Sequence, residues 1–226
     1  ALARSVAKRP KVLLLDEPMA ALDRKLREQT QFELMDLQSE LGLTFMVVTH
    51  DQDEAMTMAD RMAVMDHGKL VQIGPPDVIY EAPANRHVAE FVGDINIFEG
   101  KIAAVEGELV RAEVPHVGTV ELDEEARALK PGEVLVIGIR PEKIEIAHDE
   151  PGQGVNKVAG EIWDIGYLGD FTMIQVMLGG QDEQGKGGQL VKVALANRTR
   201  RMARPFAWDD KVWLSWDVEA GVVLPP

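Results

Sequence analysis

An apolar run that ends in two adjacent carboxylates is the feature that most constrains the fold of this chain. Val12–Leu15 contains only valine and leucine, and Asp16 and Glu17 follow it directly. A run this short and uniformly apolar is typical of a strand covered on both faces, as in a parallel sheet. Such sheets bind ligands at the carboxyl ends of their strands, where two carboxylates could hold a divalent cation and orient a water. Acidic residues also open turns before a proline such as Pro18, so the pair alone decides nothing.

The first 92 residues alternate expected strands and helices, which is the pattern of an α/β fold. Asp23 is the expected N-cap of a helix that carries an apolar stripe from Leu26 to Leu41 and ends at Gly42. A second buried-type strand at 44–48 leads to the polar residues before and at His50. The other expected elements are helices at 1–9, 52–59, 76–80 and 85–92, and a hairpin of 61–66 with 69–73.

The pattern changes after residue 92. Helical periodicity disappears, and short β-rich runs recur between glycine, proline and aspartate turns. Strands at this spacing indicate a small all-β barrel or sandwich. We therefore expect a domain boundary between residues 92 and 93, with strands beyond it at 134–139, 143–146, 171–178, 190–195 and 212–216.

Composition excludes several classes of protein. The net charge of −14 argues against sequence-independent binding of nucleic acid, which requires a basic face. The chain has no cysteine, so disulfides, thiolate metal sites and cysteine catalysis are excluded. No apolar stretch approaches the roughly 18 residues of a membrane span.

Three strings occur in an order that identifies a family: KVLLLDEPM at 11–19, AALDR at 20–24 and MVVTHDQDEAMT at 46–57. Together they closely resemble the second half of the nucleotide-binding domain of ABC transporters, and the resemblance extends over the whole chain. It implies that residues 1–92 are the carboxyl-terminal part of a P-loop NTPase fold. Nucleotide binding implies the cofactors ATP and Mg²⁺.

The resemblance assigns a role to each matching residue. Asp16 matches the Walker B aspartate, which supports the Mg²⁺ bound to ATP, and Glu17 matches the glutamate that acts as general base toward the attacking water. His50 matches the switch histidine, which reaches the terminal phosphate. Ala20–Asp23 match the D-loop, which crosses to a partner subunit and places Asp23 near nucleotide. Ala20 stands where serine is frequent, so a hydroxyl contact is absent there.

A phosphate-cradling loop of the form G-x-x-x-x-G-K-[ST] should precede the Walker B strand, and none lies before residue 12. The string GQDEQGKG at 180–187 meets most of that pattern, but it has glycine in place of the Mg²⁺-binding hydroxyl and carries two acids, so we expect a hairpin loop there. The family's signature sequence is also missing. The chain thus resembles the C-terminal portion of such a subunit, and we expect it to be inactive alone. We also expect the missing loop's strand to lie between Val12–Leu15 and Phe45–Val48.

Residues 93–226 resemble the regulatory β-domain of one branch of ABC importers. The resemblance rests on the segments GIRPE at 138–142 and EIWDIGYLGD at 161–170. The resemblance implies a TOBE/MOP-like domain with an OB-like barrel, which is similar to small oxyanion-binding modules and usually joins two ATPase subunits. No ligand site in it is predicted from the sequence.

Arginines and tryptophans cluster near the C-terminus: Arg198, Arg200, Arg201, Arg204, Trp208, Trp213 and Trp216. Such a set could form a stacking surface for nucleic acid. Because the rest of the chain is acidic, we favour a solvated basic turn followed by a strand whose tryptophans pack the barrel. An anionic effector is the remaining alternative.

The transported substrate is indicated only by closer resemblance. EAMTM at 54–58, VQIG at 71–74 and NIFEG at 96–100 look most like ATPase subunits of bacterial putrescine/spermidine importers. The implied partners are a second ATPase subunit, two transmembrane permease subunits and, indirectly, a substrate-binding protein, at the cytoplasmic face of the membrane. The alternatives are another importer substrate (sugar, iron or oxyanion), a non-catalytic regulatory or dimerisation module, and a cation-dependent hydrolase that uses Asp16, Glu17 and His50 as ligands.

Overall fold

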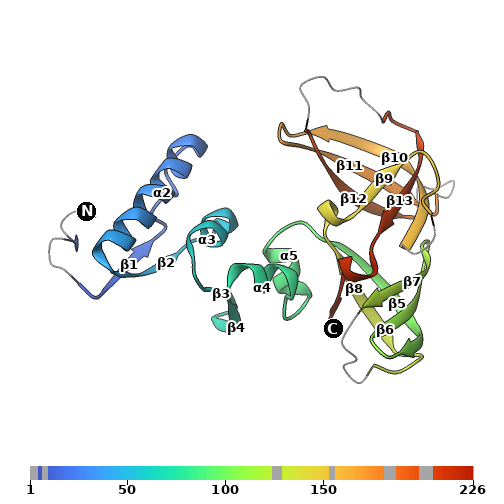
Figure 1. Cartoon of the computed structure of the whole chain (residues 1–226), viewed down its shortest axis with the longest axis horizontal. Coiled ribbons are helices and arrows are strands. Elements are labelled where there is room, and N and C mark those ends of the chain that lie inside the picture. Colours follow the sequence, from blue (N-terminus) through green and yellow to red (C-terminus); the bar gives the residue numbers. More distant parts are fainter. Residues whose placement is uncertain are drawn as a thin grey trace. The chain divides into compact units, whose positions relative to one another are not determined.

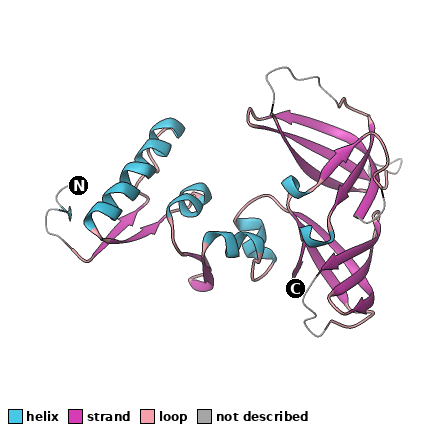
Figure 2. Cartoon of the chain, in the orientation of Figure 1, coloured by secondary structure: helices cyan, strands magenta, loops and turns pink. Residues whose placement is uncertain are grey.

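The structure, a computed structural model, describes residues 5–6, 10–123, 129–152, 156–180, 187–198 and 206–225. The chain divides into two compact units, Ala1–Ala82 and Pro83–Pro226 (Figure 1). The first unit mixes helices and strands, whereas the second is built mostly from strands (Figure 2). The domain boundary at residues 92 and 93 stays a prediction.

A strand–helix–strand segment opens the first unit. Strands β1 (Val12–Asp16) and β2 (Thr44–Val48) pair in parallel, and helix α2 (Arg24–Leu41) joins them. As predicted, α2 begins where the Asp23 carboxylate accepts a hydrogen bond from the Leu26 amide, and it ends at Gly42, whose φ of 61° suits a residue without Cβ. The stripe is only partly covered, because Leu34 is buried while Leu26 and Leu41 are 45% and 46% exposed.

The strand of the missing phosphate loop was expected between β1 and β2, and in this chain, which does not contain that strand, β1 and β2 pair directly. The two strands are hydrogen-bonded neighbours, with Val12 opposite Thr44 and Asp16 opposite Val48. A helix crossover of this length returns the chain beside its starting strand, which is the usual outcome for consecutive parallel strands. One face of the pair remains open, since its apolar side chains are 52–69% exposed: Val12, Leu14, Met46 and Val48.

The rest of the first unit follows the expected order. It comprises α3 (Gln52–Met58), β3 (Met62–Asp66), β4 (Lys69–Gly74) and α4 (Pro76–Glu81). The predicted hairpin is confirmed: β3 and β4 pair antiparallel around His67 and Gly68, which both have positive φ. Of the helix predicted at 1–9, Ser5 and Val6 are helical, and the other residues lie outside the described part.

The second unit begins with helix α5 (Arg86–Phe91) and continues as two five-stranded antiparallel sheets. The strands are β5 (Asn96–Glu106), β6 (Leu109–Val114), β7 (Gly118–Asp123), β8 (Val134–Ile139), β9 (Glu145–Ala147), β10 (Asn156–Tyr167), β11 (Phe171–Leu178), β12 (Gln189–Ala196), β13 (Lys211–Trp216) and β14 (Gly221–Leu224). One sheet has the order β14-β8-β5-β6-β7 and the other β12-β11-β10-β13-β9. The expectation of a β-rich second part is confirmed.

None of the helices in the described part of the chain has the length and apolar character needed to cross a membrane.

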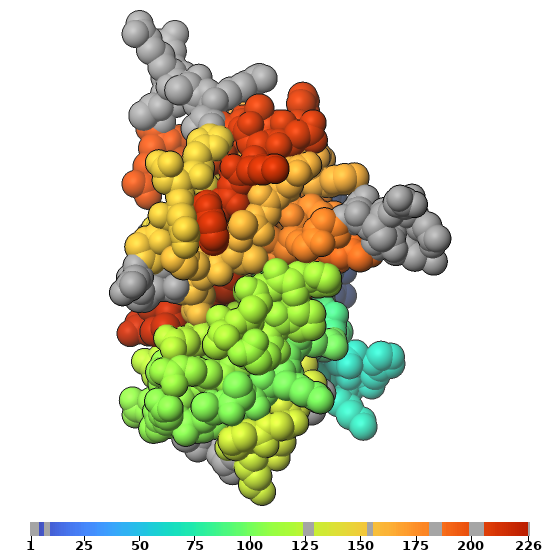
Figure 3. All heavy atoms as spheres, turned by 90° about the vertical axis from the view of Figure 1, so that its right-hand side faces the viewer, coloured from blue at the N-terminus to red at the C-terminus, as the bar shows by residue number. Residues whose placement is uncertain are grey.

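The two sheets are built by the same five-strand sequence used twice. In each half, three strands form a meander, a fourth strand pairs with the first, and a 3₁₀ turn leads to a short fifth strand. The fifth strands are exchanged, because β9 pairs with β13 and β14 pairs with β8. Figure 3 shows this unit from one side as spheres, with green residues of the first half against orange residues of the second. Both halves contribute to one contiguous buried cluster, from Phe98 to Trp216.

Two buried asparagines link the sheets at equivalent positions. Asn156, the first residue of β10, donates to the Glu121 carbonyl at 2.8 Å and accepts from the Glu121 amide at 2.7 Å. Asn96, the first residue of β5, makes the same pair of bonds with the backbone of Lys192, at 2.9 and 2.8 Å. Each amide side chain thus acts as one more backbone unit at the edge of the other sheet.

We expect Asn156→Ala to lower the free energy of unfolding of the second unit by about 2 kcal/mol, because both Glu121 backbone groups lose their partner. The four tryptophans of the chain all lie in this unit, so tryptophan fluorescence in a urea titration reports its unfolding. Gln175→Ala, at a half-buried position of β11, is the control. Equal midpoints for the two variants would contradict the linking role of Asn156.

Candidate functional site

The carboxyl ends of β1 and β2 bring three predicted site residues to one edge of the sheet. Asp16 is the last residue of β1, Glu17 follows it, and His50 lies just beyond β2. His50 Nδ1 lies 3.0 Å from Glu17 Oε1, although the residues are far apart in the chain. Their side chains are 73% and 50% exposed, so both are accessible to a ligand. Since a carboxylate can only accept, Nδ1 carries the proton and Nε2 remains for another partner.

Glu17 has a backbone conformation that points to a constrained position. Its φ is 42°, in the left-handed region that residues with a Cβ seldom adopt. Its amide donates to the Val48 carbonyl at 2.8 Å, which extends the pairing of β1 with β2 by one bond. The turn therefore redirects the chain at Glu17 while its carboxylate meets the His50 ring. Strain of this kind persists where the surroundings enforce it, which is common at functional sites.

The segment predicted as the D-loop, Ala20–Asp23, begins within two overlapping turns. The Ala20 amide donates to the Glu17 carbonyl at 3.4 Å and the Leu22 amide to the Met19 carbonyl at 3.0 Å, and Met19 is fully buried. One oxygen of Asp23 caps α2, and the side chain is exposed. The nucleotide contact expected of Asp23 stays a prediction.

A polar network behind His50 was missed by the sequence analysis. The Arg27 guanidinium donates to the Asp51 carboxylate and, at 3.2 Å, to the Leu22 carbonyl. The Thr49 hydroxyl donates at 2.7 Å to Glu54, whose side chain is 2% exposed. The string Asp51-x-x-Glu54 has the form of a capping box and could have signalled structured carboxylates here. The pairing with Arg27 has no local signal.

The described residues hold no group of three or more histidine, aspartate or glutamate side chains arranged to bind a metal ion. Asp16 is exposed at the strand end and offers oxygen ligands, the type that Mg²⁺ prefers. Its metal role stays a prediction.

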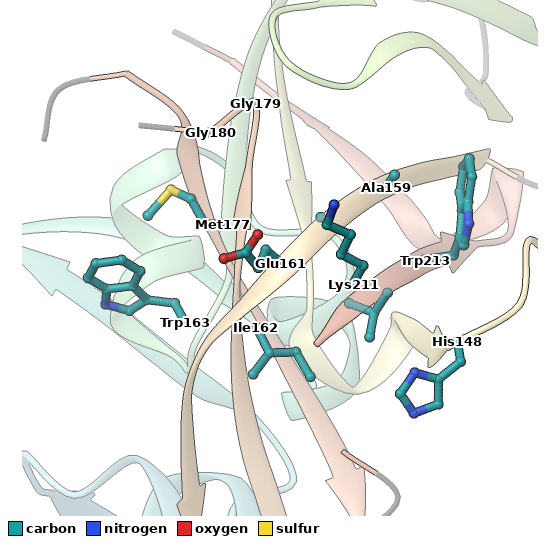
Figure 4. A pocket seen from close by; sticks show the side chains of 12 residues that line it. His148, Ala159, Glu161, Ile162, Trp163, Met177, Gly179, Gly180, Lys211 and Trp213 are labelled. Carbon is teal, nitrogen blue, oxygen red and sulfur yellow. The ribbon is translucent and has the colours of Figure 1, made fainter. Parts of the chain in front are cut away.

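The second unit has a pocket of about 570 Å³ on the β10, β11 and β13 strands. Figure 4 shows Trp163 and His148 at opposite ends of it, with Glu161 and Lys211 between them. Its polar groups do not converge on one point, so it defines no ligand. Of the tryptophans in the C-terminal cluster, Trp216 is buried and stacks on Phe98, whereas Trp208 is 64% exposed. Packing of the barrel is thus confirmed for Trp216 only. Arg200, Arg201 and Arg204 lie outside the described residues.

Fold and site together define an α/β unit with two acidic side chains and a histidine at strand ends, followed by a β-rich unit. The family model described as "TOBE domain" matches residues 137–224, so the chain contains a TOBE domain. The chain is homologous over nearly its whole length to ATP-binding proteins of polyamine import. This confirms the resemblance that the sequence motifs indicated.

Three relatives illustrate the similarity. "Putrescine transport ATP-binding protein PotG" of Escherichia coli is 44% identical over 225 residues, which are 99% of this chain and 58% of the relative. "Spermidine/putrescine import ATP-binding protein PotA" of Rubrobacter xylanophilus is 44% identical over 227 residues, 99% of this chain and 56% of the relative. "Spermidine/putrescine import ATP-binding protein PotA 2" of Pseudomonas aeruginosa is 39% identical over 222 residues, 98% and 59%. The chain thus spans less than two thirds of the length of these relatives.

Among solved structures, the cytoplasmic molybdate-binding protein ModG with molybdate bound aligns with a TM-score of 0.49 and 12% sequence identity. The alignment covers 58% of this chain and 96% of ModG. A structural similarity at this level does not indicate that this chain binds the same ligand.

Proposed function

We propose that this chain is part of an ATPase subunit that energises the import of putrescine or spermidine through an ABC transporter. The observation that carries the proposal is the contact between His50 Nδ1 and Glu17 Oε1, at 3.0 Å, beside Asp16. The names of the relatives support the polyamine substrate. The same role for a sugar, iron or oxyanion substrate is the nearest alternative.

In this proposal, three side chains have separate tasks around the terminal phosphate of ATP. Asp16 holds the Mg²⁺ that arrives with ATP, and this ion neutralises charge on the phosphate oxygens. Glu17 accepts a proton from the attacking water, for which its second carboxylate oxygen is available. The Nδ1–H group of His50 donates a hydrogen bond to Glu17, and Nε2 turns toward the phosphate. The shared contact couples the state of the phosphate to the position of the base.

The remaining assignments follow from the same proposal. Residues 1–92 form the carboxyl-terminal part of a P-loop nucleotide-binding domain, and residues 93–226 form the TOBE/MOP-like domain. The segment Ala20–Asp23 crosses to a second copy of the subunit. Two transmembrane permease subunits and, indirectly, a substrate-binding protein complete the transporter, and the subunit lies at the cytoplasmic face of the membrane.

Equilibrium binding of ATP tests the proposal at the level of this chain. We expect a Kd no tighter than about 1 mM in the presence of Mg²⁺, because no phosphate-cradling loop precedes β1. A full-length subunit that contains this chain should bind ATP in roughly the micromolar range and hydrolyse it. Isothermal titration of both proteins makes the comparison. Micromolar binding by the chain alone would contradict the requirement for the missing loop.

A non-catalytic regulatory or dimerisation module is the rival function. The observation that favours it is the buried core of the second unit, which is continuous across both sheets. If the full-length subunit neither binds nor hydrolyses ATP, that result would support the non-catalytic module. A cation-dependent hydrolase would instead bind stoichiometric metal without nucleotide.

A further inference from the structure

Arg27 connects the turn before α2 with the segment that carries His50. It lies one turn into α2, and its side chain is 30% exposed. One terminal nitrogen donates to the Leu22 carbonyl, within the segment Ala20–Asp23, and the other donates to Asp51. The remaining nitrogen, Nε, lies 3.8 Å from a carboxylate oxygen of Glu54. Nε has no hydrogen-bond partner in the described part of the chain, so its attraction to Glu54 is that of an ion pair. A planar guanidinium can donate to two acceptors and face a third group at once, which a lysine ammonium on a flexible stem cannot do with the same geometry.

Both neighbours of His50 are fixed by groups that contact Arg27. The Asp51 carboxylate uses one oxygen to accept from Arg27 and the other to cap α3 through the Glu54 amide. The Thr49 hydroxyl donates to Glu54 and accepts from the Asp51 amide at 3.0 Å. His50 therefore sits between two residues whose side chains are locked, while its own ring is free to meet Glu17.

Burial explains why this arrangement depends on Arg27. The Glu54 carboxylate is almost fully buried, and a buried carboxylate is costly unless charge and hydrogen bonds compensate it. Thr49 supplies one hydrogen bond, and Arg27 is the cation closest to the remaining oxygen. Without that cation, the Glu54 side chain would move to reach water. The hydrogen bonds of Thr49 and Asp51, which define the path of the chain at His50, would then be lost.

We propose that Arg27 is a positioning residue that links the segment Ala20–Asp23 to the orientation of the His50 ring on Glu17. The inference rests on the proposed ATPase function. Arg27 touches neither His50 nor Glu17 and acts through Asp51, Glu54 and Thr49. A displacement of Leu22 by a second subunit is passed along this path to the catalytic edge of the sheet.

A double-mutant cycle in the full-length subunit tests whether Arg27 acts through His50. Arg27→Ala should lower the kcat for ATP hydrolysis roughly tenfold or more by displacing the ring, and should change KM for ATP by less than about twofold. In the His50→Ala background the same substitution should change kcat by less than about twofold, because the group it positions is gone. Arg27→Lys should recover part of the rate. Arg61→Ala, which removes an exposed arginine before β3, is the control.

The contrary results are distinct. An equal loss of rate in both backgrounds, or no loss from Arg27→Ala, would overturn the positioning role. Absence of hydrolysis by the wild-type full-length subunit would instead overturn the proposed function. The link between Arg27 and the orientation of the His50 ring would then be tested by a measurement that needs no nucleotide.

That measurement is the ring ¹H–¹³C spectrum of the chain's five histidines, with His50 assigned by His50→Gln. Arg27→Ala should move the His50 ring signals, since the contact with Glu17 changes, and should leave the signals of the second-unit histidines in place. Arg61→Ala should move none of them. An unmoved His50 signal in the Arg27→Ala chain would overturn the link irrespective of any activity.

Discussion

Glu17→Gln is expected to lower ATP hydrolysis by the full-length subunit at least about 100-fold while ATP remains bound. Glutamine has the same size as glutamate and keeps an oxygen that can accept from His50 Nδ1, as Glu17 Oε1 does at 3.0 Å. It lacks the carboxylate that accepts the proton of the attacking water. Binding should persist because Asp16 and His50 are unchanged. Single-turnover hydrolysis and retention of labelled ATP on a filter measure the two effects separately.

Glu40→Gln is the matched control for this experiment, because Glu40 is exposed near the end of α2, away from the strand ends. It should leave both hydrolysis and retention unchanged. Turnover by Glu17→Gln at a rate near that of the wild type would remove Glu17 as the general base.

Arg140→Ala is expected to lower the free energy of unfolding of the second unit by about 3 kcal/mol. The Arg140 side chain is 3% exposed, and its Nη1 lies 3.0–3.1 Å from the carbonyl oxygens of Ala89, Gly93 and Asp94. These carbonyls lie at the end of helix α5 and on the path to β5, so a buried cation there satisfies carbonyl groups that the helix leaves without an intrahelical partner. Urea unfolding followed by tryptophan fluorescence measures the loss.

Arg111→Ala serves as the comparison. The Arg111 guanidinium pairs with Glu121 and Glu106, and the hydrogen bond that it donates to the Glu121 carboxylate is the main cause of its raised pKa. Because this pair lies at the surface, water and salt screen it, and its removal should leave the unfolding midpoint nearly unchanged. A similar shift for Arg111→Ala and Arg140→Ala would contradict the role given to burial.

Local signals in the sequence predicted individual elements well. Asp23 and Gly42 marked the two ends of α2, and the His67-Gly68 pair marked the hairpin, because capping and positive φ depend on a few adjacent residues. The neighbour of β1 could not be predicted in the same way. Which strands pair is decided by contacts between distant segments, and the direct pairing of β1 with β2 in this chain was not predicted.

The repeat within the second unit was visible in the sequence only at a few positions. Asn96, Gly100 and Ile102 recur as Asn156, Gly160 and Ile162. The asparagines link the sheets, a Cβ on either glycine would lie within 3.0 Å of the neighbouring strand, and the bulge follows the isoleucine in both halves. The other positions only need to be apolar or polar in alternation, so their identities diverge and conceal the repeat.

The candidate site was predicted through motif resemblance and not through physics alone. Asp16, Glu17 and His50 stood at strand ends in the sequence, but only the structure shows the ring of His50 on Glu17. Arg27 and Glu54 gave no sequence signal of their partnership, because a salt bridge between two helices has no fixed spacing.

The exchange of β9 and β14 between the sheets has a consequence for biosynthesis. The sheet that starts at Asn96 is completed only by Gly221–Leu224, near the end of the 226-residue chain. Pairings of such long sequence separation form slowly and late. On the ribosome, the first sheet therefore lacks its last strand until residues 221–224 have been translated. A nascent chain halted before residue 221 would leave one side of β8 as an unpaired strand edge, which can bind chaperones or aggregate.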